Sequence, residues 1–136
     1  AIEDRHIDHA KGSSLVSDAC FLSGLIKIET KDVKNNLQNA WRPKHVYHYM
    51  QWKNLQPDVV VDVTGFMTIK MSAVMAYKTQ FYDPNSDAPE TPISSKNFTD
   101  SIDYRARDLG RLIGVEHGEG FTVERYVAVN SLFDLK

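Results

Sequence analysis

The chain has 136 residues, of which 42% are hydrophobic, so it is long enough for one globular domain with a modest core. Its formal net charge of -2 and its pI near 6.2 provide no broad positive field, which excludes nucleic acid as an expected partner and favours a small polar substrate or a protein. The single cysteine excludes an internal disulfide, and no apolar run reaches the roughly 18 residues that span a membrane, so we expect a cytoplasmic protein without a membrane segment.

The first nine residues contain the densest group of ionisable side chains, Asp4-Arg5-His6-Ile7-Asp8-His9. Two imidazoles with a carboxylate between them offer a metal ligand, a proton shuttle and an anion that orients the shuttle. We expect His6 and Asp8 to form the acid/base pair, His9 to bind a metal, and Arg5 to hold a substrate anion or steady Asp8.

A simpler interpretation of the same segment is a solvated charged turn before a helix, because a zinc site needs three or four ligands and this cluster offers about two. Catalytic loops usually follow a rigid strand, and none precedes this one. We therefore expect that residue 1 is not the natural start of the protein.

Apolar residues at helical spacing predict an amphipathic helix over residues 13–28, with His9 just before or inside its first turn. Its predicted buried stripe consists of Leu15, Ala19, Leu22 and Ile26, flanked by Val16, Cys20 and Leu25, so Cys20 is expected to be an inert buried thiol. The polar residues 29–39 predict a surface loop or a short irregular helix.

Residues 45–50 and 59–63 are rich in aromatic and β-branched side chains and predict two strands, the second central in a sheet that is covered on both faces. A helix over 66–81 follows, then a proline-rich loop over 82–97, a helix over 99–113 that Gly114 ends, and a strand over 121–129. The last helix should turn Ile102, Ala106, Leu109 and Ile113 inward. This order of elements suits part of a layered α/β domain.

Three other histidines are weaker candidates for a functional role. His45 and His48 are an odd number of residues apart in a predicted strand, so they face opposite sides of the sheet and cannot share one metal. His117 lies in a glycine-rich turn over residues 114–120, which is more typical of an ordinary connector.

Several motifs in order along the chain resemble the PIG-L (LmbE-like) zinc-dependent de-N-acetylases, and among them the bacillithiol-biosynthesis deacetylases. The segments that carry the resemblance are Asp4 to His9, Arg42 to Met50, Pro57 to Val63, Ala76 to Phe81, Thr91-Pro92, and Gly114 to Phe121. The resemblance implies a Rossmann-like three-layer α/β/α fold, of which residues 1–136 would be the C-terminal part of a single deacetylase domain without its N-terminal strands.

The resemblance also implies roles for individual residues. The family's His-Pro-Asp-His element corresponds to residues 6–9, so that His9 would be a Zn²⁺ ligand and His6, helped by Asp8, would stabilise the oxyanion or protonate the leaving amine. Arg5 or Arg42 would bind the substrate's carboxylates. The family's N-terminal His-Pro-Asp-Asp motif, which supplies the other ligands and the general base, does not occur here.

Two positions depart from the family pattern. Ile7 replaces the usual proline, which changes the stiffness of the loop, and Phe98 stands where a tyrosine is expected, which removes a hydroxyl contact.

The expected activity is therefore hydrolysis of the N-acetyl group of an N-acetylglucosaminyl conjugate, with N-acetylglucosaminyl malate as the substrate that the bacillithiol branch implies. The 136 residues alone should be inactive, and the resemblance suggests a homo-oligomer, either a trimer or a hexamer. The alternative is a non-catalytic binding or assembly module that keeps part of the fold.

Overall fold

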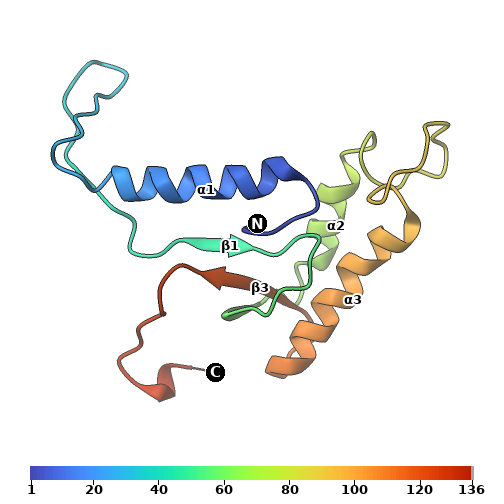
Figure 1. The fold of residues 1–136 in the computed structure, drawn as a ribbon. Coiled ribbons are helices and arrows are strands. Elements are labelled where there is room, and N and C mark those ends of the chain that lie inside the picture. The colour runs from blue at the N-terminus through green and yellow to red at the C-terminus, as the bar shows by residue number, and fades with distance from the viewer. Residues whose placement is uncertain (136) are drawn as a thin grey trace. The chain divides into compact units, whose positions relative to one another are not determined.

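The structure is a computed structural model that describes residues 1–135. Its elements in chain order are α1 (Ile7–Leu22), β1 (Tyr47–Tyr49), β2 (Val59–Asp62), α2 (Met67–Met75), α3 (Lys96–Ile113), β3 (Gly118–Val123) and the 3-10 helix η1 (Leu132–Asp134) (Figure 1). The strands form a three-stranded antiparallel sheet in the order β1-β3-β2. The mixture of helices and strands confirms the predicted α/β class. None of the helices in the described range is both long and apolar enough to cross a membrane.

The chain forms two compact units. The first contains residues 1–59 and 121–135, and the second contains residues 60–120. Strand β3 passes from the second unit into the first, so each unit contains part of it.

In the first unit, α1 lies alongside β1, which pairs with β3 (Figure 1). In this ladder Tyr47 lies opposite Val123, and His48 lies opposite Thr122. Helix α1 begins at Ile7 and ends at Leu22, earlier at both ends than predicted, so His9 lies inside its first turn as expected. Ser23 and Gly24 donate their backbone N–H groups to carbonyls of the last turn and close the helix there.

The prediction that the apolar stripe of α1 is its buried face is wrong. No residue of α1 is fully buried, and Leu15, Val16 and Leu22 are 69%, 54% and 44% exposed. The half-buried positions are His9, Ala10, Gly12, Ser13, Ser17 and Cys20. The reason is chemical: β1 and the residue after β3 present His48 and Glu124 to the helix, and these groups need hydrogen-bonding partners, which serines supply and leucines do not.

The loop over residues 29–39 contains neither a helix nor a regular strand. A single bridge joins Lys31 to Leu37, and the Asp32 carboxylate accepts the backbone N–H groups of Lys34 and Asn36. The loop is therefore held by local hydrogen bonds, as expected of an Asx-type turn.

In the second unit, α2 ends at Met75, well before the predicted Phe81. The 82–97 loop is confirmed as far as Ser95, whose hydroxyl accepts the N–H of Phe98 and caps α3. Gly114 ends α3 with a φ of 76°, a left-handed conformation that glycine adopts without strain. Ala106 and Leu109 are buried as predicted, whereas Ile113 is 43% exposed.

Strand β3 covers Gly118–Val123, which places half of the predicted glycine-rich turn in the sheet and ends the strand before the predicted Val129. The glycines allow α3 to approach this strand closely. A Cβ on Gly110 would lie 2.7 Å from the His117 nitrogen, and one on Gly118 would lie 2.9 Å from the Gly110 nitrogen. The helix and the strand therefore meet backbone to backbone, where no side chain fits.

The prediction that residues 59–63 form a central strand is wrong. The sheet order β1-β3-β2 puts β2 at an edge, and Val61 is 45% exposed. An apolar run of this length is compatible with an edge strand as well as with a central one, because composition does not report the number of neighbouring strands.

We predict that Gly110→Ala destabilises the protein by about 1–3 kcal/mol, because the new methyl group would overlap the backbone of residues 116 and 117. The free energy of unfolding from urea denaturation measures this loss. Gly12→Ala is the matched control, since it is also a helical glycine but nothing lies within 4 Å of the added Cβ. It should be neutral or slightly stabilising. Equal effects of the two substitutions would contradict the close contact.

Candidate functional site

The histidine loop, residues Asp4 to His9, leads directly into α1. His6 is the N-cap residue, and its Nδ1 accepts the backbone N–H of Asp8 at 3.3 Å. The rings of His6 and His9 have their centroids 5.7 Å apart. The start of the helix thus brings the two predicted functional imidazoles together.

His9 is held by a carboxylate that the sequence analysis did not assign to it. Its Nδ1 lies 2.7 Å from Asp4 Oδ2, and the Asp4 side chain is only 2% exposed. The other oxygen, Asp4 Oδ1, accepts the N–H of Arg5 at 2.6 Å. A carboxylate only accepts hydrogen bonds, so Nδ1 of His9 carries the proton and Nε2 has the lone pair. Metal-binding histidines are commonly held in this way.

The expected pair of His6 and Asp8 is present as a loose contact between the two side chains and not as a hydrogen bond. Asp8 Oδ2 lies 3.6 Å from His6 Nδ1, beyond hydrogen-bonding distance, and the Asp8 side chain is 75% exposed. Because Asp8 lies in the first turn of α1, its carboxylate faces the positive end of the helix. The hydrogen bond to the His6 ring comes from the backbone N–H of Asp8, while the carboxylate lies in looser contact with the same nitrogen.

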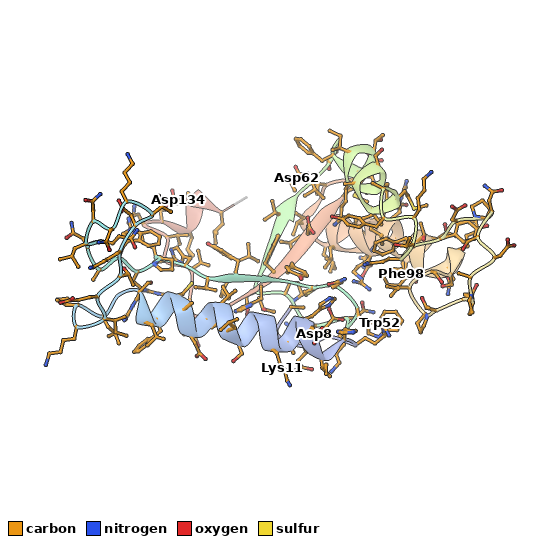
Figure 2. All side chains as sticks on the ribbon, turned by 90° about the horizontal axis from the view of Figure 1, so that it is seen from above. Asp8, Lys11, Trp52, Asp62, Phe98 and Asp134 are labelled. Carbon is orange, nitrogen blue, oxygen red and sulfur yellow. The ribbon has the colours of Figure 1, made fainter. Side chains whose placement is uncertain are left out.

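Arg5 lies at the same end of the unit as the histidines. Its guanidinium carbon is 5.6 Å from the centre of the Trp52 ring, and Figure 2 shows Trp52 near Asp8 at the start of α1. This stacking keeps the Arg5 charge beside the histidine loop.

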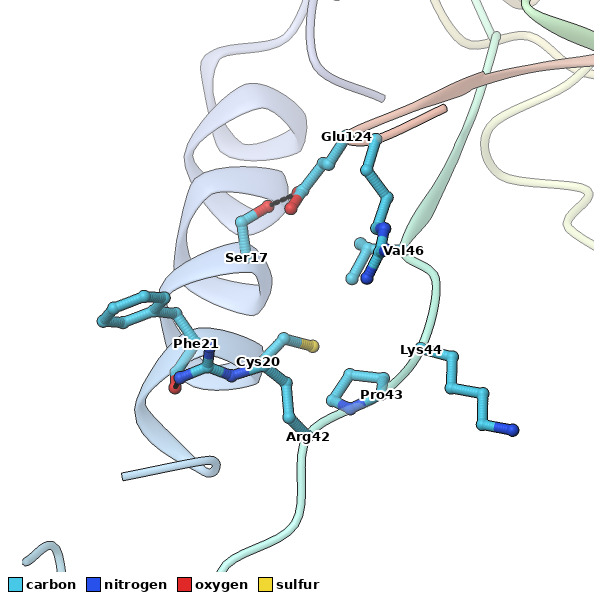
Figure 3. Close-up of a pocket in the computed structure, with 9 residues that line it drawn as sticks. Ser17, Cys20, Phe21, Arg42, Pro43, Lys44, Val46 and Glu124 are labelled. Atoms are coloured by element: carbon cyan, nitrogen blue, oxygen red, sulfur yellow. Dashed lines mark hydrogen bonds between the residues drawn. The ribbon is translucent and has the colours of Figure 1, made fainter. Parts of the chain in front are cut away.

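Arg42 lies at the other end of α1. Its Nη2 donates to the Phe21 carbonyl at 2.8 Å, and its guanidinium carbon lies 4.5 Å from the centre of the Phe21 ring (Figure 3). A helix of 16 residues is about 24 Å long. The structure therefore does not bring Arg42 together with His6 and His9, and its observed contacts are with the carbonyl and the ring of Phe21 in the last turn of the helix.

Two small cavities adjoin α1 within this unit. One, of about 240 Å³, is lined by Cys20, Arg42, Pro43 and Lys44 among others (Figure 3). Cys20 is half-buried and lines this cavity, so the expected fully buried thiol is not found.

The remaining histidines occupy different surroundings. His45 precedes β1, and its ring is tilted against that of Tyr47 with the centroids 5.9 Å apart. His48 is buried in β1 and hydrogen-bonded to Ser13 and Glu124. His117, directly before β3, is 6% exposed, and its Nε2 lies 3.4 Å from Asp103 Oδ1. The carboxylate of Asp103 has its pKa lowered chiefly by a hydrogen bond from Arg107.

The histidine loop fits a metal only in part. His9 presents one nitrogen with the required orientation, but within residues 1–135 no three histidine, cysteine, aspartate or glutamate side chains gather where they could hold one ion. A zinc ion takes three or four protein ligands. The described residues therefore offer one suitably oriented imidazole nitrogen and not the three or four ligands of a zinc site.

Comparison with known proteins supports the fold. No family model matches the sequence. The crystal structure of the conserved protein TT1542 from Thermus thermophilus is similar, with a TM-score of 0.72 and 22% sequence identity over 95% of this chain and 51% of that one. The chain thus spans about half the length of TT1542, and at this identity the likeness shows the fold alone.

We predict that Asp4→Asn weakens Zn²⁺ binding through His9 by about 10–100-fold, since loss of a carboxylate that orients a ligand has effects of this size. Calorimetric titration measures the affinity. Nitrogen chemical shifts of the His9 ring, recorded without metal, report whether the proton stays on Nδ1.

Asp8→Asn is the matched control, because Asp8 carries the same charge in the same loop but makes no hydrogen bond with a histidine side chain through its carboxylate. It should leave both the affinity and the His9 tautomer nearly unchanged. Equal losses in the two variants would show that only the local negative charge matters, and would contradict a positioning role for Asp4.

Proposed function

We propose that this chain takes part in zinc-dependent hydrolysis of the N-acetyl group of an N-acetylglucosaminyl conjugate, with release of acetate. The observation that carries the proposal is the contact between Asp4 and His9, which leaves Nε2 of His9 ready to bind a metal beside a second, exposed imidazole. The resemblance of the Asp4 to His9 segment to the PIG-L (LmbE-like) deacetylases supports the same chemistry.

Each residue of the loop has a distinct task in this proposal. His9 binds the ion through Nε2, and Asp4 holds the ring in place. His6, whose side chain is 52% exposed, donates a hydrogen bond or a proton to the substrate at the acetamide carbonyl or the leaving amine. When bound, Zn²⁺ would acidify a water molecule and polarise a carbonyl.

Arg5 is the residue of this site best placed to select an anionic conjugate. Its guanidinium lies over Trp52 at the edge of the histidine loop. N-acetylglucosaminyl malate, a precursor in bacillithiol biosynthesis, carries two carboxylates that such a group binds in bidentate fashion. We place Arg42 outside this site, because it contacts the far end of α1.

The proposal requires further metal ligands and a general base from outside residues 1–135, since these residues present one ligand. We accordingly propose that the chain forms the later part of a Rossmann-like three-layer α/β/α domain, acting in the cytoplasm as a homo-oligomer. The match to TT1542 over half of that protein's length supports a larger fold.

A non-catalytic binding or assembly module is the second candidate. The observation that favours it is the lack of any group of three potential metal ligands among the described residues. Such a module would keep the fold without turning over a substrate.

We predict chelator-sensitive acetate release from N-acetylglucosaminyl malate by the natural polypeptide that contains these residues, with slower release from N-acetylglucosamine. His9→Ala should abolish activity together with part of the zinc affinity. His6→Ala should lower kcat by about 10²–10⁴-fold with the zinc content unchanged, because proton donation contributes a factor of this size.

Lys11→Ala is the control on the same helix, since Lys11 is exposed two residues beyond His9 and has no hydrogen bond or ion pair with the histidine loop in the described part of the chain (Figure 2). It should retain full activity. A folded, zinc-loaded protein that releases no acetate from either compound would overturn the deacetylase proposal and favour the binding module.

A further inference from the structure

A second polar cluster lies one helical turn beyond His9. Ser13 Oγ is 2.7 Å from His48 Nδ1, and His48 Nε2 is 2.8 Å from Glu124 Oε1. His48 is only 7% exposed, whereas Ser13 is half-buried. The three side chains come from α1, β1 and the residue after β3, and they form a continuous serine–histidine–glutamate chain.

The carboxylate of Glu124, at one end of this chain, determines the direction of each hydrogen bond in it. A glutamate carboxylate only accepts hydrogen bonds, so His48 Nε2 carries the proton and donates it to Glu124. Hydrogen bonds from the Ser17 hydroxyl and then from His48 hold the pKa of Glu124 below its usual range, which keeps it ionised. Nδ1 of His48 is therefore an acceptor, and the Ser13 hydroxyl donates to it.

A cavity adjoins this chain. It has a volume of about 270 Å³, and Ser13, His48 and Glu124 all line it, together with Ser14, Ser17 and Thr122. The Thr122 hydroxyl is buried and has no hydrogen-bonding partner among the described residues. The cavity thus contains the Ser13 hydroxyl, which is hydrogen-bonded to an imidazole, and the Thr122 hydroxyl, which can donate a hydrogen bond to a bound molecule. The volume of the cavity suits a short acyl group.

We propose that Ser13 is a nucleophile that accepts a short acyl group from a carboxylic ester, with His48 as its general base and Glu124 as the anion that orients His48. Serine proteases use the same three roles, although there Nε2 is the base and Nδ1 faces the carboxylate. Here the ring is reversed. The base is then Nδ1, which accepts from Ser13, and Nε2 is the nitrogen held by the Glu124 carboxylate.

The reaction proceeds in two steps, acylation of Ser13 and hydrolysis of the acyl-Ser13 ester. Ser13 Oγ attacks the ester carbonyl carbon while its proton moves to His48 Nδ1, and Glu124 stabilises the imidazolium. The C–O bond to the alcohol then breaks, the alcohol leaves with that proton, and an acyl-Ser13 ester remains. Water, deprotonated by Nδ1 in the same way, hydrolyses this ester to the carboxylic acid and regenerates Ser13. In this proposal the Thr122 hydroxyl, which has no hydrogen-bonding partner among the described residues, donates to the carbonyl oxygen.

The first test is labelling with a fluorophosphonate, which forms a Ser–O–P bond with loss of fluoride, followed by mass spectrometry of the peptides. We expect the label on Ser13, its loss in Ser13→Ala, and at least a roughly tenfold slower reaction in His48→Gln. Ser14→Ala is the matched control, because Ser14 lines the same cavity but no hydrogen bond joins it to His48. It should label as the unmodified protein does.

A second measurement covers the case in which His48→Gln does not fold. In a Cys20→Ser background, which removes the one native cysteine, Ser13→Cys and Ser14→Cys place a thiol at either position. Alkylation by iodoacetamide should be at least roughly tenfold faster at position 13, since only that thiol has a base beside it. No label on Ser13 of the folded protein, or equal alkylation at the two positions, would overturn the proposal and leave the chain of hydrogen bonds as packing only.

Discussion

The structure of the first unit depends on one buried imidazole, that of His48, whose two nitrogens both have hydrogen-bonding partners. His48 lies inside the β1–β3 ladder and is hydrogen-bonded to Ser13 on one side and Glu124 on the other. Leaving either nitrogen without a partner would cost about 1–3 kcal/mol. Helix α1 therefore turns its serines, not its leucines, toward the sheet.

The same rotation of α1 sets the position of the histidine loop. His9, Ser13 and Ser17 follow one another at intervals of four residues, so they form one stripe along the helix. When Ser13 meets His48, His9 is carried to the same half-buried side, where Asp4 reaches its Nδ1. One hydrogen-bonded stripe thus orients both the candidate metal ligand and the candidate nucleophile.

Local signals in the sequence predicted the element types well. Gly114 ends α3 as expected, and the prolines of residues 82–97 exclude regular structure up to the α3 cap. The position of His9 in the first turn of α1 also followed from periodicity. These features depend on residues close together in the chain, and such interactions can be read from sequence.

Features that depend on distant residues could not be predicted. Which face of α1 is buried depends on Glu124, more than a hundred residues later, and Asp4 reaches His9 only through the loop conformation. The edge position of β2 depends on the pairing of the other strands. Arg42 was expected near the site by resemblance, but it contacts the end of α1. The sequence does not show which carbonyl a long arginine side chain can reach.

The orientation of α1 also changes how this segment tolerates mutation. In most helices of globular proteins, truncating leucines and valines is costly and truncating serines is not. In α1 we expect the opposite, namely that truncating a serine costs more than truncating a leucine or valine. Leu15 and Val16 are mostly exposed, while Ser13 and Ser17 are hydrogen-bonded to His48 and Glu124. Substitutions in this helix should therefore be tolerated best at its leucine and valine positions and least at the serines that are hydrogen-bonded to His48 and Glu124.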